Sequence, residues 1–283
     1  MSPDVFAPVL LAAIGHAGWN FAARWVSGNF PVFWLSTWAG AAALTPFVIA
    51  IGLRTESWPA VTPVGIACVI GTGLVHALYF ILLARAYSRG EISVVYPIAR
   101  GSGIGITALL AWQVLSEEIS LAGLAGIGLV FAGILVMGIP AYRRKSTGIG
   151  LALSVGLTIP AYSIIDKIGV SLVHPTVYVW LMYLQSGLFL WPFVRRWHGG
   201  EVLRAGRRYW PYVLIIGVGA SMTYMAILFA FQLGRVSYIV ALREVAVVIG
   251  AILGILVLKE RLDLWKAIAI GAITAGIVCI KAG

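Results

Sequence analysis

Charged residues are scarce in this sequence. Only 11% of its 283 residues are Asp, Glu, Lys or Arg, whereas 61% are hydrophobic. With a mean hydropathy of +0.98, the chain has too few polar side chains to cover a soluble domain of this length. The composition excludes a water-soluble globule and predicts a chain that lies in a lipid bilayer.

Cysteine and the usual catalytic patterns are also rare or missing. Cys68 and Cys279, the only two cysteines, lie in apolar runs, where a cysteine is by default a small packing residue. The apolar runs contain no His-Glu-x-x-His pattern and no nucleophile with a base, as an intramembrane enzyme would need. A haem or retinal protein would need paired axial histidines or a lysine at mid-span, whereas Lys266 lies near a helix start. We therefore expect no enzymatic activity, no metal and no cofactor.

Long apolar runs make up most of the chain. A membrane-spanning helix needs roughly 20 mostly apolar residues, and the sequence divides into ten such stretches. We expect them at residues 5–26, 31–53, 62–84, 92–115, 119–139, 148–169, 175–194, 209–232, 236–258 and 262–281. The first is predicted to be a spanning helix, because no basic segment precedes it and nine more spans follow. The fold class is an all-α integral membrane protein.

The net charge of +10 comes from the loops. If the ten spans are right, 13 loop lysines and arginines fall on one side of the membrane and four on the other. This bias is typical of the positive-inside rule and predicts cytoplasmic basic loops and periplasmic termini in a bacterial inner membrane. We expect the basic loops to contact anionic lipid headgroups and not nucleic acid.

The two halves of the chain resemble each other at an offset of about 143 residues. This offset aligns Trp19 with Tyr162, Asn20 with Ser163 and Arg100 with Arg243. The matches follow one order along most of the chain, so we infer a duplicated five-helix unit, with repeats at 1–141 and 148–283. Because five is odd, the second repeat enters the membrane in the opposite sense. Inverted repeats are the architecture of alternating-access transporters, which makes transport the leading hypothesis.

A family resemblance supports this hypothesis. The stretch "LVLKERLDLWKAIAIGAITAGIVCI", with a short charged turn before a last helix rich in Gly and Ala, resembles the EamA family of the drug/metabolite transporter superfamily. The first copy has "SEE" where that family usually has Glu-Arg. Within the family, the aromatic-rich spans are most similar to YddG-type amino-acid exporters. The resemblance implies ten helices around a central cavity and a small organic substrate.

Arg243 and Glu244 are adjacent within an otherwise apolar run. An arginine at bilayer depth costs about 2.5–3.5 kcal/mol on insertion scales, so each of these residues needs a partner. Neighbours on a helix are about 100° apart, and we expect the two to face different helices. Glu244 is expected to face Arg100 or a histidine, and Arg243 backbone carbonyls or a substrate carboxylate. The alternative is a structural ion pair that holds two helices together.

Histidines and aromatic residues supply further candidates for the site. His16 and His76 lie inside spans, where a histidine either relays protons or bonds a neighbouring helix. Glu244 is a second candidate for a proton relay, and the first helix carries no mid-span acid, since Asp4 lies at its start. Asn20 offers an uncharged donor and acceptor, for substrate or for a neighbouring helix. At least half of one aromatic set is expected to face the cavity: Trp19, Tyr79, Tyr96, Tyr162, Tyr224 and Tyr238.

Two prolines and two helices rich in small residues complete the predictions. Pro97 and Pro160 interrupt their spans and are expected to act as hinges. The helices at 119–139 and 262–281 are predicted to be packing helices, at a dimer contact or within a monomer.

We expect an inner-membrane exporter of amino acids, aromatic or broadly neutral, or of related small metabolites. The predicted substrate-binding residues are Trp19, Asn20, His76, Tyr79, Tyr96, Arg100, Tyr162, Tyr224, Tyr238, Arg243 and Glu244. Efflux of cationic drugs is the alternative, but it favours an acidic cavity, and Arg100 and Arg243 outnumber Glu244, the only acid expected there. A membrane receptor or scaffold is a third possibility, although inverted duplication has no evident use in one.

Overall fold

The structure is a computed structural model that describes residues 2–26, 29–54, 62–89, 92–142, 148–259 and 261–283. All regular elements in these residues are helical, and ten predicted membrane spans are confirmed. The helices are α1 (Pro3–Ala23), the short 3-10 turn η1 (Arg24–Val26), α2 (Phe30–Arg54), α3 (Pro63–Arg89), α4 (Ile92–Leu115), α5 (Leu121–Tyr142), α6 (Ile149–Leu172), α7 (Pro175–His198), α8 (Val202–Leu233), α9 (Val236–Leu242), α10 (Val245–Leu258) and α11 (Leu264–Ala282). The ninth span consists of α9 and α10, because the helix breaks between them.

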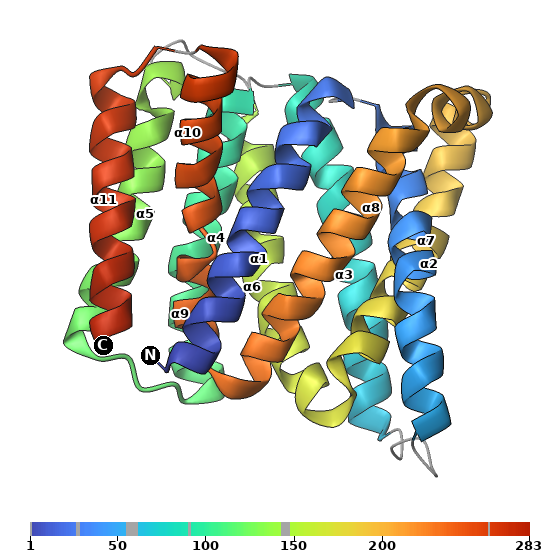
Figure 1. The fold of residues 1–283 in the computed structure, drawn as a ribbon, viewed down its shortest axis with the longest axis horizontal. Helices are drawn as coiled ribbons and strands as arrows, with labels where there is room; N and C mark the ends of the chain where they lie inside the picture. The colour runs from blue at the N-terminus through green and yellow to red at the C-terminus, as the bar shows by residue number, and fades with distance from the viewer. Residues whose placement is uncertain (1, 27–28, 55–61, 90–91, 143–147, 260) are drawn as a thin grey trace.

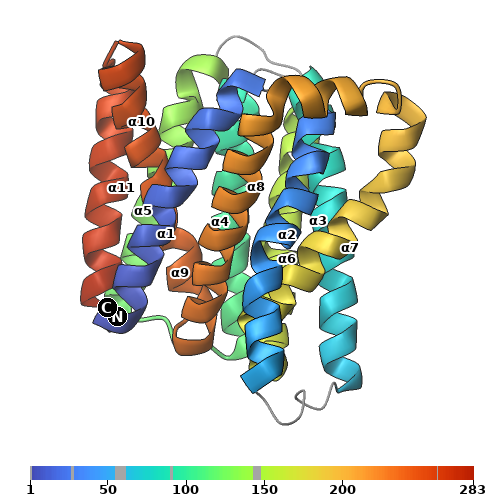
Figure 2. The ribbon, with the colours of Figure 1, turned by 45° about the vertical axis from the view of Figure 1, so that its right-hand side comes forward.

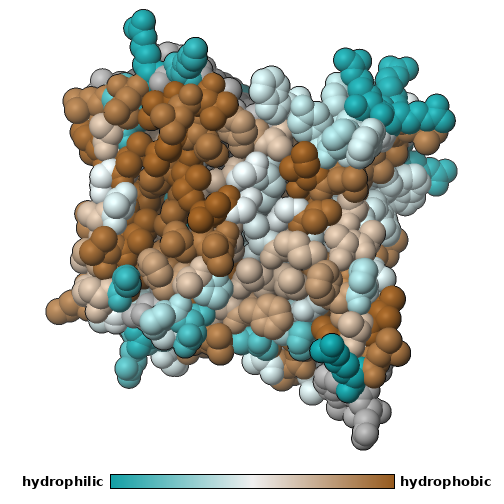
Figure 3. Space-filling model, viewed as in Figure 1, coloured by the Kyte–Doolittle hydropathy of each residue, from teal (hydrophilic) through white to brown (hydrophobic). Residues whose placement is uncertain are grey.

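The two ends of the helical bundle differ in charge. Both chain termini lie at the lower end of Figure 1, which we call the terminal end, as an even number of spans requires. The opposite end, which we call the basic end, carries these described cations: Arg89, Arg195, Arg196, Arg204, Arg207, Arg208, Lys259 and Arg261. Hydrophobic residues cover much of the middle of the face in Figure 3, and hydrophilic ones gather above and below them. The chain is a multi-pass membrane protein. Arg143, Arg144 and Lys145 of the predicted basic loops lie outside the described residues.

The helices pack as two inverted halves, α1–α5 and α6–α11. Helix α1 rises from the terminal end and its counterpart α6 descends toward it (Figures 1 and 2). The packing is reciprocal, since α1 contacts α8 while α6 contacts α3, the counterpart of α8. Helices α2 and α7 contact each other, as do α5 and α11. Each of these contacts joins one half to the other, so the seam between the halves runs through the middle of the molecule.

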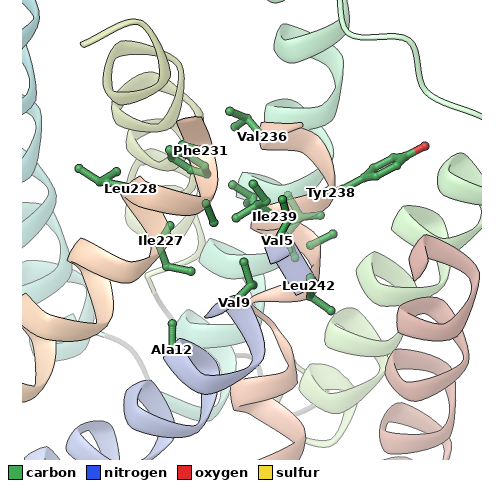
Figure 4. Close-up of a cluster of buried hydrophobic side chains, with 14 of the residues drawn as sticks. Val5, Val9, Ala12, Ile227, Leu228, Phe231, Val236, Tyr238, Ile239 and Leu242 are labelled. Atoms are coloured by element: carbon green, nitrogen blue, oxygen red, sulfur yellow. The ribbon is translucent and has the colours of Figure 1, made fainter. Parts of the chain in front are cut away.

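The hydrophobic core is continuous at the terminal end and divided at the basic end. The largest buried cluster includes the first turns of α1, the last turns of α8 and all of α9, as Figure 4 shows around Val5, Val9 and Phe231. At the basic end three smaller clusters lie between α1, α2 and α8, between α2, α3 and α7, and between α3, α4 and α6. Because these clusters are separate, the helices at the basic end pack in groups of three, and no single core joins all of them.

Helices α5 and α11 approach each other closely through glycine. A Cβ added at Gly126 would lie 2.6 Å from the carbonyl oxygen of Gly276, and the reverse holds for Gly276. Such a contact requires glycine, because any side chain would collide with the opposite backbone. The close approach strengthens van der Waals packing between the two membrane helices. The small residues that suggested packing helices therefore face each other within one chain.

Candidate functional site

The break in the ninth span lies at Arg243 and Glu244. Helix α9 ends at Leu242 and α10 begins at Val245. Between them the backbone forms tighter bonds over three residues, from Glu244 N–H to the Ala241 carbonyl and from Ala246 N–H to the Arg243 carbonyl, both at 3.1 Å. A 3-10 segment within a helix often marks a functional hinge, and the sequence did not predict this one.

Glu244 is paired with Arg100 of α4. The Nε of Arg100 donates to Oε2 of Glu244 at 3.0 Å, and its Nη2 donates to Oε1. Glu244 is fully buried and Arg100 is 7% exposed. This two-point pair joins the two repeats through residues next to the broken helix, and it matches the first of the two partners expected for Glu244.

Arg243 has few partners although it is buried. Its Nη2 donates to the Tyr162 hydroxyl at 3.4 Å, which is a long hydrogen bond. Its Nε lies 3.8 Å from Oε1 of Glu244 but has no hydrogen-bond partner among the described residues. Glu244 is thus bonded to α4 and Arg243 to α6, so the expectation that the two residues face different helices is confirmed, although the partner of Arg243 is a tyrosine hydroxyl and not a backbone carbonyl. Arg243 keeps donors that are free for another acceptor.

A cavity of about 160 Å³ lies between the two halves. It is lined by residues from both halves, including nine of the predicted ones: His16, Trp19, Asn20, His76, Tyr79, Arg100, Tyr162, Tyr224 and Arg243. Glu244 is not part of the lining and lies behind Arg100. The cavity also has lining residues on α2 and α7 that the sequence did not single out, among them Phe33, Ser36 and Ser186.

Aromatic rings surround the middle of the cavity. The rings of His76 and Tyr162 are 4.5 Å apart with their planes tilted by 33°, and the rings of Tyr224 and His76 form a T-shaped pair at 5.5 Å. Tyr79 meets Tyr162 edge to face at 6.3 Å. Such faces bind apolar groups, aromatic rings or cations.

The lining also contains polar atoms without partners. Trp19 Nε1, Ser186 Oγ and Arg243 Nε are buried and have no hydrogen-bond partner among the described residues. An unsatisfied buried donor costs about 1–3 kcal/mol. A ligand or water in the cavity would supply the acceptors that these three polar atoms lack.

Other predicted residues lie elsewhere or are not described. Tyr238 is buried, but its ring points away from the other labelled side chains in Figure 4, and its hydroxyl accepts from the Ser120 backbone N–H at 3.0 Å, outside the cavity. Asn20 lines the cavity but donates to the His16 carbonyl on its own helix at 2.7 Å. The side chains of Tyr96 and Pro97 lie outside the described residues. Pro160 is buried within α6, which continues through it.

Sequence reasoning missed one buried acid, Asp166 of α6. Its side chain is fully buried; Oδ1 accepts from the Tyr178 hydroxyl at 2.9 Å, and Oδ2 accepts from the Tyr224 hydroxyl. Glu244 is therefore not the only acid near the cavity. A signal was present, because Asp166 lies in "AYSIIDK", the stretch that aligns with the first helix. The predicted span ended at residue 169, which placed Asp166 near an interface, whereas α6 continues to Leu172.

Comparisons with known proteins agree with this architecture. The model of the EamA-like transporter family matches residues 5–139 and again residues 146–282. A solved crystal structure is similar to this chain with a TM-score of 0.75 and 16% sequence identity, over 98% of this chain and 97% of the other. No curated protein matches the chain. With both halves matched over nearly their whole length, the chain belongs to the EamA-like transporter family of the drug/metabolite transporter superfamily, a family of membrane transporters.

Proposed function

We propose that this protein exports amino acids, aromatic or broadly neutral, or related small metabolites that carry a carboxylate. The observation that carries this proposal is Arg243, a buried guanidinium that lines the cavity with an unpartnered Nε. Arg100, the other buried cation of the lining, is already neutralised by Glu244. A charged hydrogen bond to a carboxylate would give Arg243 the partner that it lacks.

The remaining lining suits the rest of such a substrate. Tyr162, His76 and Tyr224 offer aromatic faces to an apolar side chain or an ammonium group. Trp19 Nε1 and Ser186 Oγ add polar contacts. A cavity of about 160 Å³ is below the 300–1,000 Å³ typical of drug-sized ligands, which favours a small solute.

A cationic drug fits this lining less well. Glu244 lies behind Arg100, and both carboxylate oxygens of Asp166 accept hydrogen bonds from tyrosines. Neither acid lines the cavity, so a cation would meet Arg243 without a free countercharge.

Transport by alternating access would follow from the two inverted halves. In this conformation the cavity is sealed at the terminal end by the continuous core, and exchange of the two halves' conformations would open that end. We further propose that the protein lies in a bacterial inner membrane with its basic end cytoplasmic, and that it works as a monomer among anionic lipids.

Counterflow in liposomes tests the substrate assignment. Purified protein would be reconstituted with internal unlabelled amino acid, and uptake of radiolabelled amino acids and of cationic dyes would be measured. We expect saturable amino-acid uptake whose apparent affinity falls by about 10-fold or more in Arg243→Gln. Arg204→Gln, at an exposed arginine of the basic end, should leave uptake unchanged. Saturable dye uptake without uptake of any amino acid would contradict the assignment.

A further inference from the structure

Asp166 is a buried carboxyl group without a cation in contact. It is fully buried in α6, and no ion pair to it forms within the described residues. An isolated carboxylate is costly to hold in such a place, so it is either neutral or stabilised by the groups around it. The protonation state of Asp166 therefore depends on those groups.

The charged and titratable neighbours come from every helix packed on α6. Helix α3 contributes His76 and Cys68, α7 contributes Tyr178 and α8 contributes Tyr224. On α4, Arg100 is paired with Glu244, and at the α9–α10 break Arg243 faces Tyr162. On α6 itself, Lys167 follows Asp166 but donates to the carbonyls of Phe231 and Gly234 at the end of α8.

The Tyr178 hydroxyl lies between two acceptors. It is 2.9 Å from Oδ1 of Asp166 and 3.1 Å from the carbonyl oxygen of Cys68, and it has one hydrogen. If Asp166 is ionised, that hydrogen serves the carboxylate and the second contact is lost. If Asp166 is protonated, its O–H donates to the Tyr178 oxygen, and Tyr178 donates to Cys68. Tyr224 donates to Oδ2 in both cases. With Asp166 protonated, both contacts of the Tyr178 oxygen are used as hydrogen bonds.

We propose that Asp166 is a proton-binding site whose occupancy stabilises closure of the terminal end. The proton comes from water in the cavity, which reaches the carboxyl group past Tyr224, a residue that lines the cavity and contacts Oδ2. Binding converts the carboxylate to a carboxylic acid and hydronium to water. This inference rests on the proposed function only where it links the proton to transport.

The connection to closure follows from which helices the proton joins. The bonds from Asp166 through Tyr178 to Cys68 link α6, α7 and α3, and Tyr224 adds α8. Separation of these helices would admit water and allow the acid to ionise. A ligand shifts a conformational equilibrium toward the state that binds it more tightly, so the proton favours the closed form.

Asp166 belongs to one repeat only. The alignment of the two halves places Ala23 opposite it, so the first helix carries no equivalent acid. Because this acid has no counterpart in the first half, its titration affects the second half alone.

Infrared spectroscopy tests proton binding without any substrate. In purified wild-type protein near neutral pH, we expect the C=O stretching band of a protonated carboxyl group. Asp166→Asn should remove this band, whereas Glu244→Gln, at the other buried acid, should leave it in place. Should Asp166→Asn fail to fold, Asp166→Glu should move the band to a different frequency. The absence of a band in wild type, or a band unaffected by changes at Asp166, would overturn the proposal.

Proteoliposomes containing a pH-sensitive dye test the connection to transport. Substrate added to wild-type protein should move protons, and Asp166→Asn should lose this movement while it retains counterflow. Counterflow by wild type without proton movement would overturn the coupling and leave the proposed function intact. Absence of all amino-acid counterflow would contradict the proposed function and leave the infrared result to decide on the proton site.

Discussion

In the proposed function, the residue that matters most for substrate choice is Arg243. Replacing it by Gln removes a charged donor, and such hydrogen bonds contribute about 1.5–3 kcal/mol. We expect the apparent affinity for a carboxylate substrate to fall by roughly 10-fold to more than 100-fold. Arg243→Lys should recover part of this loss because the charge remains. Binding would be measured by titration of substrate against intrinsic tryptophan fluorescence, and equal affinities in wild type and Arg243→Gln would exclude this role.

Arg100 and Glu244 are predicted to differ from Arg243 in their effect on stability. Removal of one partner from a buried ion pair is destabilising by about 3–5 kcal/mol, whereas apolar replacement of both is often nearly neutral. We therefore expect Arg100→Gln and Glu244→Gln to lower the thermal unfolding temperature in detergent. The double change Arg100→Leu with Glu244→Leu should lower the unfolding temperature by less than the sum of the single changes. Additive losses would show that the two residues act independently.

The sequence was most informative about charged residues whose burial in an apolar run is energetically costly. Arginine and glutamate in the middle of an apolar run need partners, and this led to the Arg100–Glu244 pair. Asp166 escaped notice because the predicted span placed it near an interface, and because its partner Tyr224 comes from α8, 58 residues along the chain. Tyr238 was singled out for its residue type, but the rotation of α9 directs it to Ser120 and away from the cavity. Which face of an apolar helix meets the cavity depends on packing, which residue type does not reveal.

At the scale of helices, Glu117 caps α9 from another part of the chain. Its carboxylate accepts from Val236 N–H at 2.6 Å, Ser237 N–H at 3.1 Å and the Ser237 hydroxyl at 2.6 Å. Negative charge at a helix N-terminus is favourable, and loss of a cap costs about 0.5–2 kcal/mol. We expect Glu117→Ala to lower the free energy of unfolding by this amount. Glu118→Ala is the matched control, because Glu118 is exposed and makes no hydrogen bond in the described part of the chain. Equal stability of the two variants would exclude the cap.

The contact between α5 and α11 gives a second prediction for helices. In Gly126→Ala, the new Cβ would lie 2.6 Å from the Gly276 carbonyl oxygen and the helices must separate. We expect the free energy of unfolding to fall by about 1–3 kcal/mol, which is typical of overpacking. Gly128 lies one half-turn away with open space around it, so Gly128→Ala should be neutral or stabilising by up to about 1 kcal/mol. Chemical unfolding in detergent micelles compares the two, and a tolerated Gly126→Ala would contradict the close contact.

Hydropathy predicted the existence of the helices better than their shape. Ten apolar runs are enough to place ten spans, since lipid requires the backbone to bond within each segment. The break at Arg243 was not predicted, because α9 and α10 are both apolar and continuous in pattern. Helix α8 begins at Val202, earlier than predicted, and has non-helical dihedral angles at Tyr209, where a basic amphipathic turn joins the apolar span.

At the scale of the whole molecule, the proposed transport requires movement between two halves that share one seam. The terminal end is closed where Val5 of α1 meets Gly234 after α8, because a Cβ added at Gly234 would lie 2.9 Å from Val5 Cγ1. These residues belong to different repeats. A disulfide between cysteines placed there should hold the terminal end closed. Gly133 and Ile273 lie against each other between α5 and α11, where a Cβ added at Gly133 would be 2.7 Å from Ile273 Cγ1, and they provide a control crosslink between the halves away from the cavity.

Counterflow of amino acid through the crosslinked protein tests the proposed movement most directly. Val5→Cys with Gly234→Cys, in a chain whose own two cysteines are replaced, would be oxidised, reconstituted and measured before and after reduction. We expect no counterflow in the oxidised protein and recovery of counterflow after reduction, whereas the Gly133→Cys and Ile273→Cys crosslink should leave transport intact. Full counterflow through protein crosslinked at Val5 and Gly234 would contradict it.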